Sequence, residues 1–234
     1  MKQLTLSATL LLMTFMASAH ALWIETSAKG TKNKTHQVRV YLGEFGDNER
    51  DSVVKWFSNM KDAELFITDP SGNKQKITLR DAGNHYAGEF TPATEGHYTL
   101  SVAHTVADIY NEGKIEYYAT ASVNVGKASN EALSKSTYLS VVPPVEAGKV
   151  KSPLNLQVFM EGAPVAKAKV LVISPDGWER TLYSDEAGKV SCATIQPGMH
   201  MLEVVKILKT PGTHNGKSFK QVTHLVTHCI QVNK

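Results

Sequence analysis

The residues of this sequence best suited to chemistry are its nine histidines, which are spread along the chain and form no tag-like run. Neutral imidazole nitrogens suit nickel, copper, cobalt and zinc as ligands. The sequence therefore indicates a divalent transition metal (Ni, Co, Cu or Zn) as the bound species, and the question becomes which histidines hold it.

The strongest candidate is His20, in the stretch MASAHALWIE. Residues 1–19 are typical of a secretory signal peptide, with a positive start, a short apolar stretch and small residues at the cleavage site. Cleavage after Ala19 makes His20 the amino terminus, where its α-amine and ring can chelate one ion. Cleavage after Ala21 is the alternative, and it removes His20 together with the leader.

Two further imidazoles are candidates to complete a site with His20. His36 and His104 lie near the ends of expected strands, on the apolar faces. Either side chain could meet a terminal residue there, or could be a core-edge histidine satisfied by a backbone carbonyl. Glu44 and Asp47 are candidate oxygen ligands from a long loop, or simply solvated acidic residues. The predicted metal ligands are thus His20, His36 and His104.

The other histidines are expected to have structural or solvent-facing positions. His224 and His228 are four residues apart, which on a strand separates them by about 13 Å, too far for one ion to bridge. They share a face with apolar residues, so a structural role is predicted for both. His85 and His97 have the opposite parity to the apolar residues of their strands, which predicts that both face solvent.

The elements that must position these residues are short β-strands. Segments with period-two alternation, separated by turns rich in Gly, Pro, Asn and Asp, recur along the chain, and no segment has a helical period over three turns. About seven strands per half predict an all-β protein of two tandem Ig-like or transthyretin-like β-sandwich domains. These domains would span residues 20–126 and 137–234, with a linker at 127–136. Residues 43–61 break the pattern and are expected to form a long loop or short helix.

Charge and hydropathy exclude several classes of protein. The formal net charge is +3, and no basic patch of the kind that binds nucleic acid is present. After the leader, no segment is apolar for long enough to span a bilayer. The mature protein is therefore expected to be a periplasmic protein that does not span the membrane.

Only two cysteines occur, Cys192 and Cys229. In an oxidising compartment an even pair favours one disulfide. A pair of buried or metal-binding thiols is the alternative, and the sequence leaves both open.

The motifs of common enzyme classes are missing from the sequence. It contains no Gly-x-Ser-x-Gly elbow, His-Glu-x-x-His pair, phosphate loop or dinucleotide fingerprint. The prediction is a protein that is not an enzyme. A terminal-histidine copper oxygenase is the enzymatic alternative, and it would need a second histidine and an aromatic neighbour, for which His104 with Tyr117 or Tyr118 are the candidates.

The second half carries a recognisable pattern. The corners Gly162-Ala163-Pro164, Asp185-Glu186-Ala187-Gly188 and Pro197-Gly198, each followed by an alternating strand, resemble a carboxypeptidase-regulatory or transthyretin-like sandwich. With AHALWIE, YLGEFG and LSVVPP, the whole mature chain resembles a periplasmic family of unknown function whose members are described as the periplasmic component of cobalt or nickel uptake. Members begin after the leader with His, a short gap and Leu-Trp, as His20, Leu22 and Trp23 do here.

Two functions follow from these observations. The first is a periplasmic metal-binding protein that captures a divalent ion with histidine nitrogens and passes it to a membrane transporter component. Because the imidazole must be neutral, its binding should weaken below about pH 6. The second is a non-enzymatic structural or interaction module of the cell envelope, with Trp56, Phe57 and Trp178 as contact residues.

Overall fold

The computed structural model describes residues 20–127, 136–143, 148–193 and 196–234. The expected signal peptide and most of the expected linker lie outside these residues. The described chain consists of strands, turns and two short 3₁₀ segments, η1 (Val53–Lys55) and η2 (Met60–Asp62). The all-β prediction is confirmed. Residues 43–61 were expected to form a long loop or short helix, but they first complete a short hairpin between β3 (His36–Glu44) and β4 (Glu49–Arg50) and only then form the 3₁₀ turns.

The strands of the first half are β1 (Ala21–Thr26), β2 (Lys29–Gly30), β3 (His36–Glu44), β4 (Glu49–Arg50), β5 (Leu65–Thr68), β6 (Lys74–Ile77), β7 (Arg80–Asp81), β8 (Tyr86–Phe90), β9 (Gly96–Thr105) and β10 (Gly113–Val125). Those of the second half are β11 (Leu139–Val142), β12 (Gly148–Lys149), β13 (Pro153–Met160), β14 (Ala163–Pro164), β15 (Lys169–Ile173), β16 (Glu179–Tyr183), β17 (Lys189–Ala193), β18 (Gly198–Leu208), β19 (Gly212–His214), β20 (Lys217–Phe219) and β21 (Gln221–Asn233).

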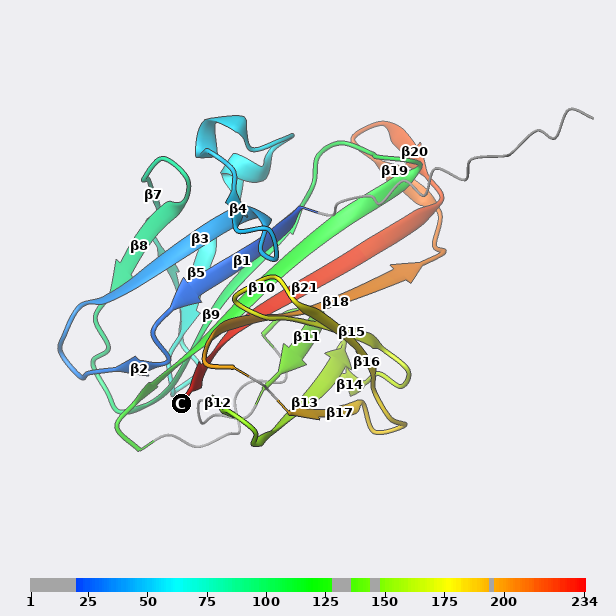
Figure 1. Ribbon diagram of the computed structural model, residues 1–234. Coiled ribbons are helices and arrows are strands. Elements are labelled where there is room, and N and C mark those ends of the chain that lie inside the picture. The colour runs from blue at the N-terminus through cyan, green and yellow to red at the C-terminus, as the bar shows by residue number, and fades with distance from the viewer. Residues whose placement is uncertain (1–19, 128–135, 144–147, 194–195) are drawn as a thin grey trace, which may run out of the picture.

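The central feature is a ten-stranded sheet built by both halves of the chain. Its main path runs β16-β15-β18-β21-β10-β9-β5-β6, with β12 beside β21 and β2 beside β10. The halves meet where β10 and β21 pair in parallel, from Gly113 opposite Gln221 to Thr120 opposite His228 (Figure 1). The ranges 20–126 and 137–234 therefore share one sheet, where the sequence analysis expected two tandem sandwiches.

Two hydrophobic cores lie on opposite faces of this shared sheet, because successive side chains of a strand point to opposite sides. On β10, Ala119 and Ala121 face the first core while Tyr118 faces the second, and on β21 Leu225 and Val226 divide in the same way. The sheet β1-β3-β8-β7 contributes to the first core and the sheet β11-β13-β14 to the second.

A third cluster joins β1 to the second half of the chain. Trp23 is fully buried and stacks on Tyr41 with ring centroids 5.4 Å apart, and Met201 of β18 and Ile173 of β15 belong to the same cluster. The guanidinium of Arg50 lies over both rings, 5.6 Å from the Trp23 centroid and 5.0 Å from that of Tyr41. These contacts fix β1, and with it the position of His20, on the shared sheet.

Both cysteines are free thiols in the structure. Cys192 on β17 packs in the second core, whereas Cys229 on β21 packs against the Trp23 cluster on the other face of the shared sheet. The disulfide that the sequence left open does not form, because the sheet separates the two side chains.

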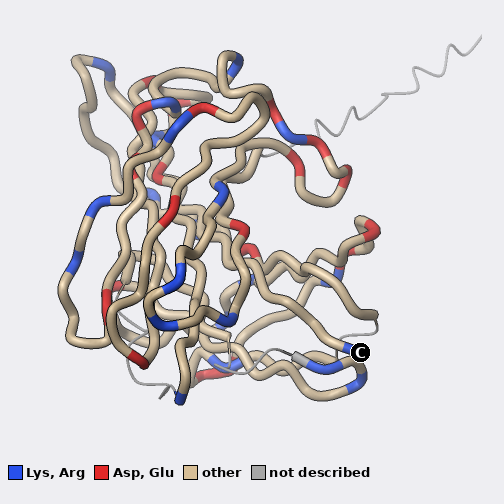
Figure 2. The backbone as a smooth tube through the Cα atoms, turned by 90° about the vertical axis from the view of Figure 1, so that its left-hand side faces the viewer, with Lys and Arg blue, Asp and Glu red and all other residues tan. Residues whose placement is uncertain are grey.

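Charged residues of both signs are interspersed along the backbone (Figure 2). This distribution agrees with the small net charge. None of the helical turns in the described part of the chain has the length and apolar character needed to cross a membrane.

Candidate functional site

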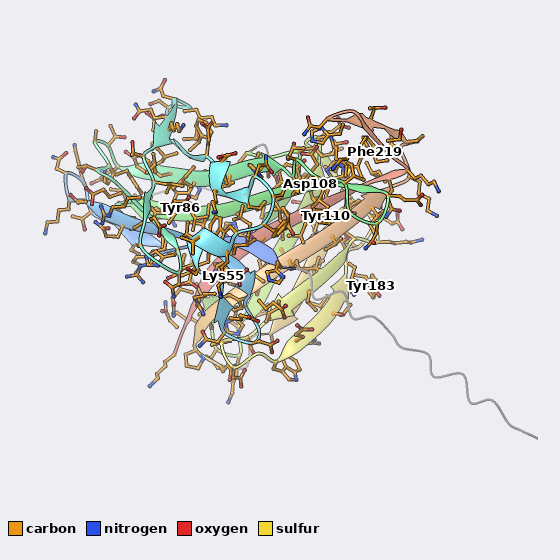
Figure 3. All side chains as sticks on the ribbon, turned by 90° about the horizontal axis from the view of Figure 1, so that it is seen from above. Lys55, Tyr86, Asp108, Tyr110, Tyr183 and Phe219 are labelled. Atoms are coloured by element: carbon orange, nitrogen blue, oxygen red, sulfur yellow. The ribbon has the colours of Figure 1, made fainter. Side chains whose placement is uncertain are left out.

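The start of β1 is held on the shared sheet by two side-chain hydroxyls. Tyr117 of β10 donates to the backbone carbonyl of His20 at 2.7 Å, and Thr227 of β21 donates to the carbonyl of Leu22 at 2.6 Å. Figure 3 looks down on this end of the molecule, where the segment carrying Lys55 and the loop carrying Tyr110 flank the beginning of β1. The backbone at His20 is therefore fixed by two strands that lie far along the chain.

The ring of His20 lies between two carboxylates. Its Nε2 is 3.2 Å from Oδ2 of Asp51, and its Nδ1 is 4.0 Å from Oε1 of Glu44. The edge of Phe57 closes one side, with ring centroids 6.4 Å apart. The imidazole keeps 36% of its surface exposed, so an ion in solution can reach it.

A tight hairpin brings the two carboxylates together. Gly43 has φ +150, and a Cβ at that position would lie 2.4 Å from the carbonyl oxygen of Glu49. Only glycine allows the chain to pass so closely there. Glu44 and Glu49 are then opposite each other in the backbone register of β3 and β4. The backbone N–H of Asp51 donates a hydrogen bond to the carbonyl of Leu42 at 2.9 Å.

The electrostatic setting of Glu44 suits a cation. Burial raises the pKa of the Glu44 carboxyl, and the nearby acidic residues Asp47 and Glu49 raise that pKa further, while His20 lowers it. A positive charge beside Glu44 would relieve this repulsion.

Asp51 and Glu44 lie at different distances from the two nitrogens of the His20 ring. Asp51 lies at hydrogen-bonding distance from Nε2 and so favours the proton on that nitrogen, which leaves a lone pair on Nδ1. Such a carboxylate behind a histidine is common where the other ring nitrogen binds a metal. The gap between Nδ1 and Glu44 is too long for a hydrogen bond, but one ion with bonds of about 2.0–2.2 Å spans up to about 4.3 Å between two ligand atoms.

Side chains alone do not complete a metal site here. Among the described residues, no group of three or more His, Cys, Asp or Glu side chains is arranged to hold a metal ion. His20 and Glu44 give two donors, and cleavage after Ala19 would add the α-amine of His20 as a third. The donor set, two nitrogens and one carboxylate oxygen, fits a divalent transition metal.

His36 does not lie near His20. Ala21 pairs with Gly43 at one end of β3, and His36 begins the strand at the other end, seven residues or about 23 Å away. Its Nε2 contacts the hydroxyl of Thr26 at 2.8 Å, and its ring packs against Phe90. A hollow of about 650 Å³ opens beside it, between β1 and the end of β21.

His104 lies in the first core, on the face that Val102 and Val106 share. The pairing of β9 with β10, which continues through the hydrogen bond from Val106 N to Ile115 O, places it opposite Tyr117. Its ring hydrogen-bonds the backbone of Asn59, its Nε2 has no partner, and burial lowers its pKa. No hydrogen bond or ring contact joins it to His20. Of the three predicted ligands, only His20 has carboxylate oxygens within 4.0 Å of its ring nitrogens among the described residues.

The remaining histidines mostly follow the expectations. His224 contacts the hydroxyl of Tyr118 at 3.1 Å, and His228 contacts that of Thr120 at 2.8 Å, and both are buried on the face of the shared sheet that carries the second core. The prediction for His97 is wrong, because it is buried, with Nδ1 2.7 Å from Oδ1 of Asn124. His97 does point away from the first core, as its place in the alternation predicts. It is buried because the opposite face of the shared sheet is also covered.

Asp51 is the site residue that the sequence analysis missed. It lies in the segment 43–61, where no periodicity indicates which side chains turn toward β1. Only the return of the chain from β4 to Leu42 places it beside the ring.

Comparisons with known proteins identify a family but no activity. A family model described as "Domain of unknown function (DUF4198)" matches residues 17–207. No curated protein matches the sequence. Among solved structures, a Salmonella alpha-2-macroglobulin reacted with methylamine has 11% identity and a TM-score of 0.31 over 91% of this chain, which spans 15% of that protein. A segment of two fibronectin type III domains from chicken tenascin has 10% identity and a TM-score of 0.27, with 88% and 98% of the two chains covered.

Proposed function

Because this chain belongs to the DUF4198 family, whose function is unknown, we propose its function from the site itself: it is a periplasmic protein that binds a divalent transition metal at the amino terminus of its mature chain. The observation that carries the proposal is the position of the His20 ring between Asp51 and Glu44. The metal is cargo in this proposal, held for an uptake or homeostasis system.

In this proposal the processed chain supplies three donors. The α-amine and Nδ1 of His20 form a chelate, and the carboxylate of Glu44 binds from the hairpin. Asp51 holds the proton on Nε2 and keeps the ring oriented. Tyr117 anchors the backbone of the same residue through its carbonyl, so little conformational entropy is lost when the ion binds.

The chemistry of the donors gives the expected preference. Two nitrogens and one carboxylate form a site that leaves positions open for water or for a ligand from a partner. Affinity would follow the usual order, with copper ahead of nickel and zinc. An open and partly exposed site suits a protein that must release its ion to a membrane partner.

The proposal is tested on the untagged protein exported to the periplasm and recovered without chelators. Native mass spectrometry gives the cleavage site and any retained metal. Calorimetric titration with Ni²⁺, Co²⁺, Cu²⁺ and Zn²⁺ at neutral pH then gives the affinities. We expect a chain that begins at His20 and binds one ion.

Three variants locate the ion. His20→Ala should abolish binding, Glu44→Gln should weaken it by at least tenfold, and an extra residue before His20 should weaken it by blocking the amine. His36→Ala is the control, since that imidazole lies about 23 Å along β3 from the end that pairs with Ala21 and should leave the affinity unchanged.

Two results would overturn the proposal. A mature chain that begins at Leu22 lacks the chelating residue, and a chain that begins at His20 but ignores all four ions has no such site. Either result favours the interaction module, for which the exposed Trp178 stays a candidate contact residue, whereas Trp56 is buried in the first core and Phe57 packs against it.

A further inference from the structure

A carboxylate on β18 lies beside the start of β1 and forms no ion pair with the side chains of the described residues. Glu203 follows Met201 by two residues, so both side chains project to the same face of the sheet, where Met201 packs against Ala21 and Trp23. Glu203 is also directly opposite Thr227, the residue whose hydroxyl holds the carbonyl of Leu22. Glu203 is therefore placed next to the first residues of β1.

The surroundings of this carboxylate are unfavourable for its charge. Burial raises the pKa of Glu203 to about 7, and Glu179 on β16 adds repulsion that Lys169 on β15 offsets only in part. No hydrogen bond or ion pair joins Glu203 to another of the described side chains. A largely desolvated carboxylate without a hydrogen-bond partner is costly, so a cation or a hydrogen-bond donor beside Glu203 would be stabilised.

The backbone of β1 aims a nitrogen at this region. In an extended strand, the N–H and C=O of one residue point to the same side, as the paired bonds of antiparallel strands require. The carbonyls of His20 and Leu22 point to the shared sheet, toward Tyr117 and Thr227. The nitrogen of His20 therefore points to the shared sheet as well. The charge of Glu203 also acts on Tyr117, the residue bonded to His20.

We propose that Glu203 receives the amino group of the processed chain and accepts a hydrogen bond from the α-nitrogen of His20. This rests on the part of the proposed function that places the mature terminus at His20. In the metal-free protein the pair is an ammonium and a carboxylate. When an ion binds the amine, the nitrogen keeps two N–H groups, and Glu203 accepts from one of them. Glu203 is thus a positioning residue for the terminal donor.

The test compares two amino termini in two backgrounds, without metal. One chain begins at His20 and the other retains Ala19, each with Glu203 or with Glu203→Gln. We expect the chain that begins at His20 to melt about 3 °C higher than the extended chain, the shift of one modest interaction in a chain of this size. Glu203→Gln should remove that difference, and Glu203→Asp should restore part of it.

The control is Glu179→Gln, which changes a neighbouring acidic residue and should keep the difference between the two termini. An equal difference with and without the carboxylate at position 203 would overturn the proposal, as would a Glu179→Gln variant that loses the difference. If Glu203→Gln does not fold, Glu203→Met, which also lacks the carboxylate, carries the same comparison, and an unchanged difference there has the same meaning.

A second measurement separates this proposal from the metal hypothesis. If the chain binds a metal at His20 and Glu203 also holds the α-nitrogen, titration of the chain that begins at His20 should show about tenfold weaker metal binding in Glu203→Gln. If no chain binds a metal, the proposed function is wrong. The melting comparison still tests the contact between Glu203 and the amino group, because it is made without metal. Unchanged affinity in Glu203→Gln would count against the positioning of the donor.

Discussion

The hydroxyl of Tyr117 donates to the carbonyl of His20 at 2.7 Å, across 97 positions of the chain. One bond thus ties the start of β1 to the middle of the shared sheet. Tyr117→Phe should lower the free energy of unfolding by about 1–2 kcal/mol, because a partly buried carbonyl loses its donor. Urea denaturation measures this loss.

The same substitution should also weaken metal binding, because it frees the residue that is proposed to chelate the ion. Tyr98→Phe is the matched control, since its hydroxyl donates to the carbonyl of Thr94 at 3.0 Å in the same core. It should cost similar stability and leave the affinity unchanged. Equal affinities in both variants would show that the anchor does not support the site.

Asp51 is predicted to act through the ring that it contacts at 3.2 Å. Asp51→Asn removes the charge that favours the proton on Nε2, and loss of such a carboxylate typically costs ten- to a hundredfold in metal affinity. Calorimetric titration of the chain that begins at His20 measures the change. Glu49→Gln, in the same hairpin, should reduce the affinity much less, and an equal loss would indicate only a general effect of charge.

Arg50 is predicted to stabilise β1 through the stacking of its planar guanidinium. It lies over Trp23 and Tyr41 and pairs with Glu25 at 3.0 Å. Lysine cannot stack in the same way, so Arg50→Lys should cost about 1 kcal/mol in unfolding free energy. Lys76→Gln, which breaks an exposed pair with Glu64, should stay within about 0.5 kcal/mol of the wild type. Similar losses in the two variants would contradict the stacking account.

His228 is predicted to make the fold sensitive to acid. Burial, together with a smaller effect of the neighbouring His97, lowers its pKa from 6.5 to about 3. The unfolded chain therefore takes up a proton as the pH falls below about 6.5, while the native chain does not. Stability is full above that pH and is lost progressively toward pH 3, by an amount on the order of 4 kcal/mol.

Denaturation midpoints between pH 7 and pH 4 would measure this dependence. His228→Gln removes the titrating group, so the slope should fall by nearly one proton, whatever the variant costs in absolute stability. The other buried histidines have lowered pKa values too and would keep part of the slope. A slope that does not change would refute the assignment to His228.

The alternation along single strands was readable without the tertiary structure. It predicted the all-β class and the inward face of His224 and His228, because these depend on the period of two within one strand. The prediction that His20 becomes the terminal residue also came from local features, namely the small residues and the apolar stretch of the expected leader.

Which strands became neighbours was decided only in three dimensions. The parallel pairing of β10 with β21 joins residues more than a hundred positions apart, and no local pattern encodes such a partner. That pairing covers both faces of one sheet, which buries His97, separates Cys192 from Cys229 and brings Tyr117 to His20. Side-chain type and spacing determined which residues are capable of chemistry, while the pairing of β1 with β3 and the return of the chain from β4 determined that Asp51 and Glu44 lie beside the ring of His20 and that His36 does not.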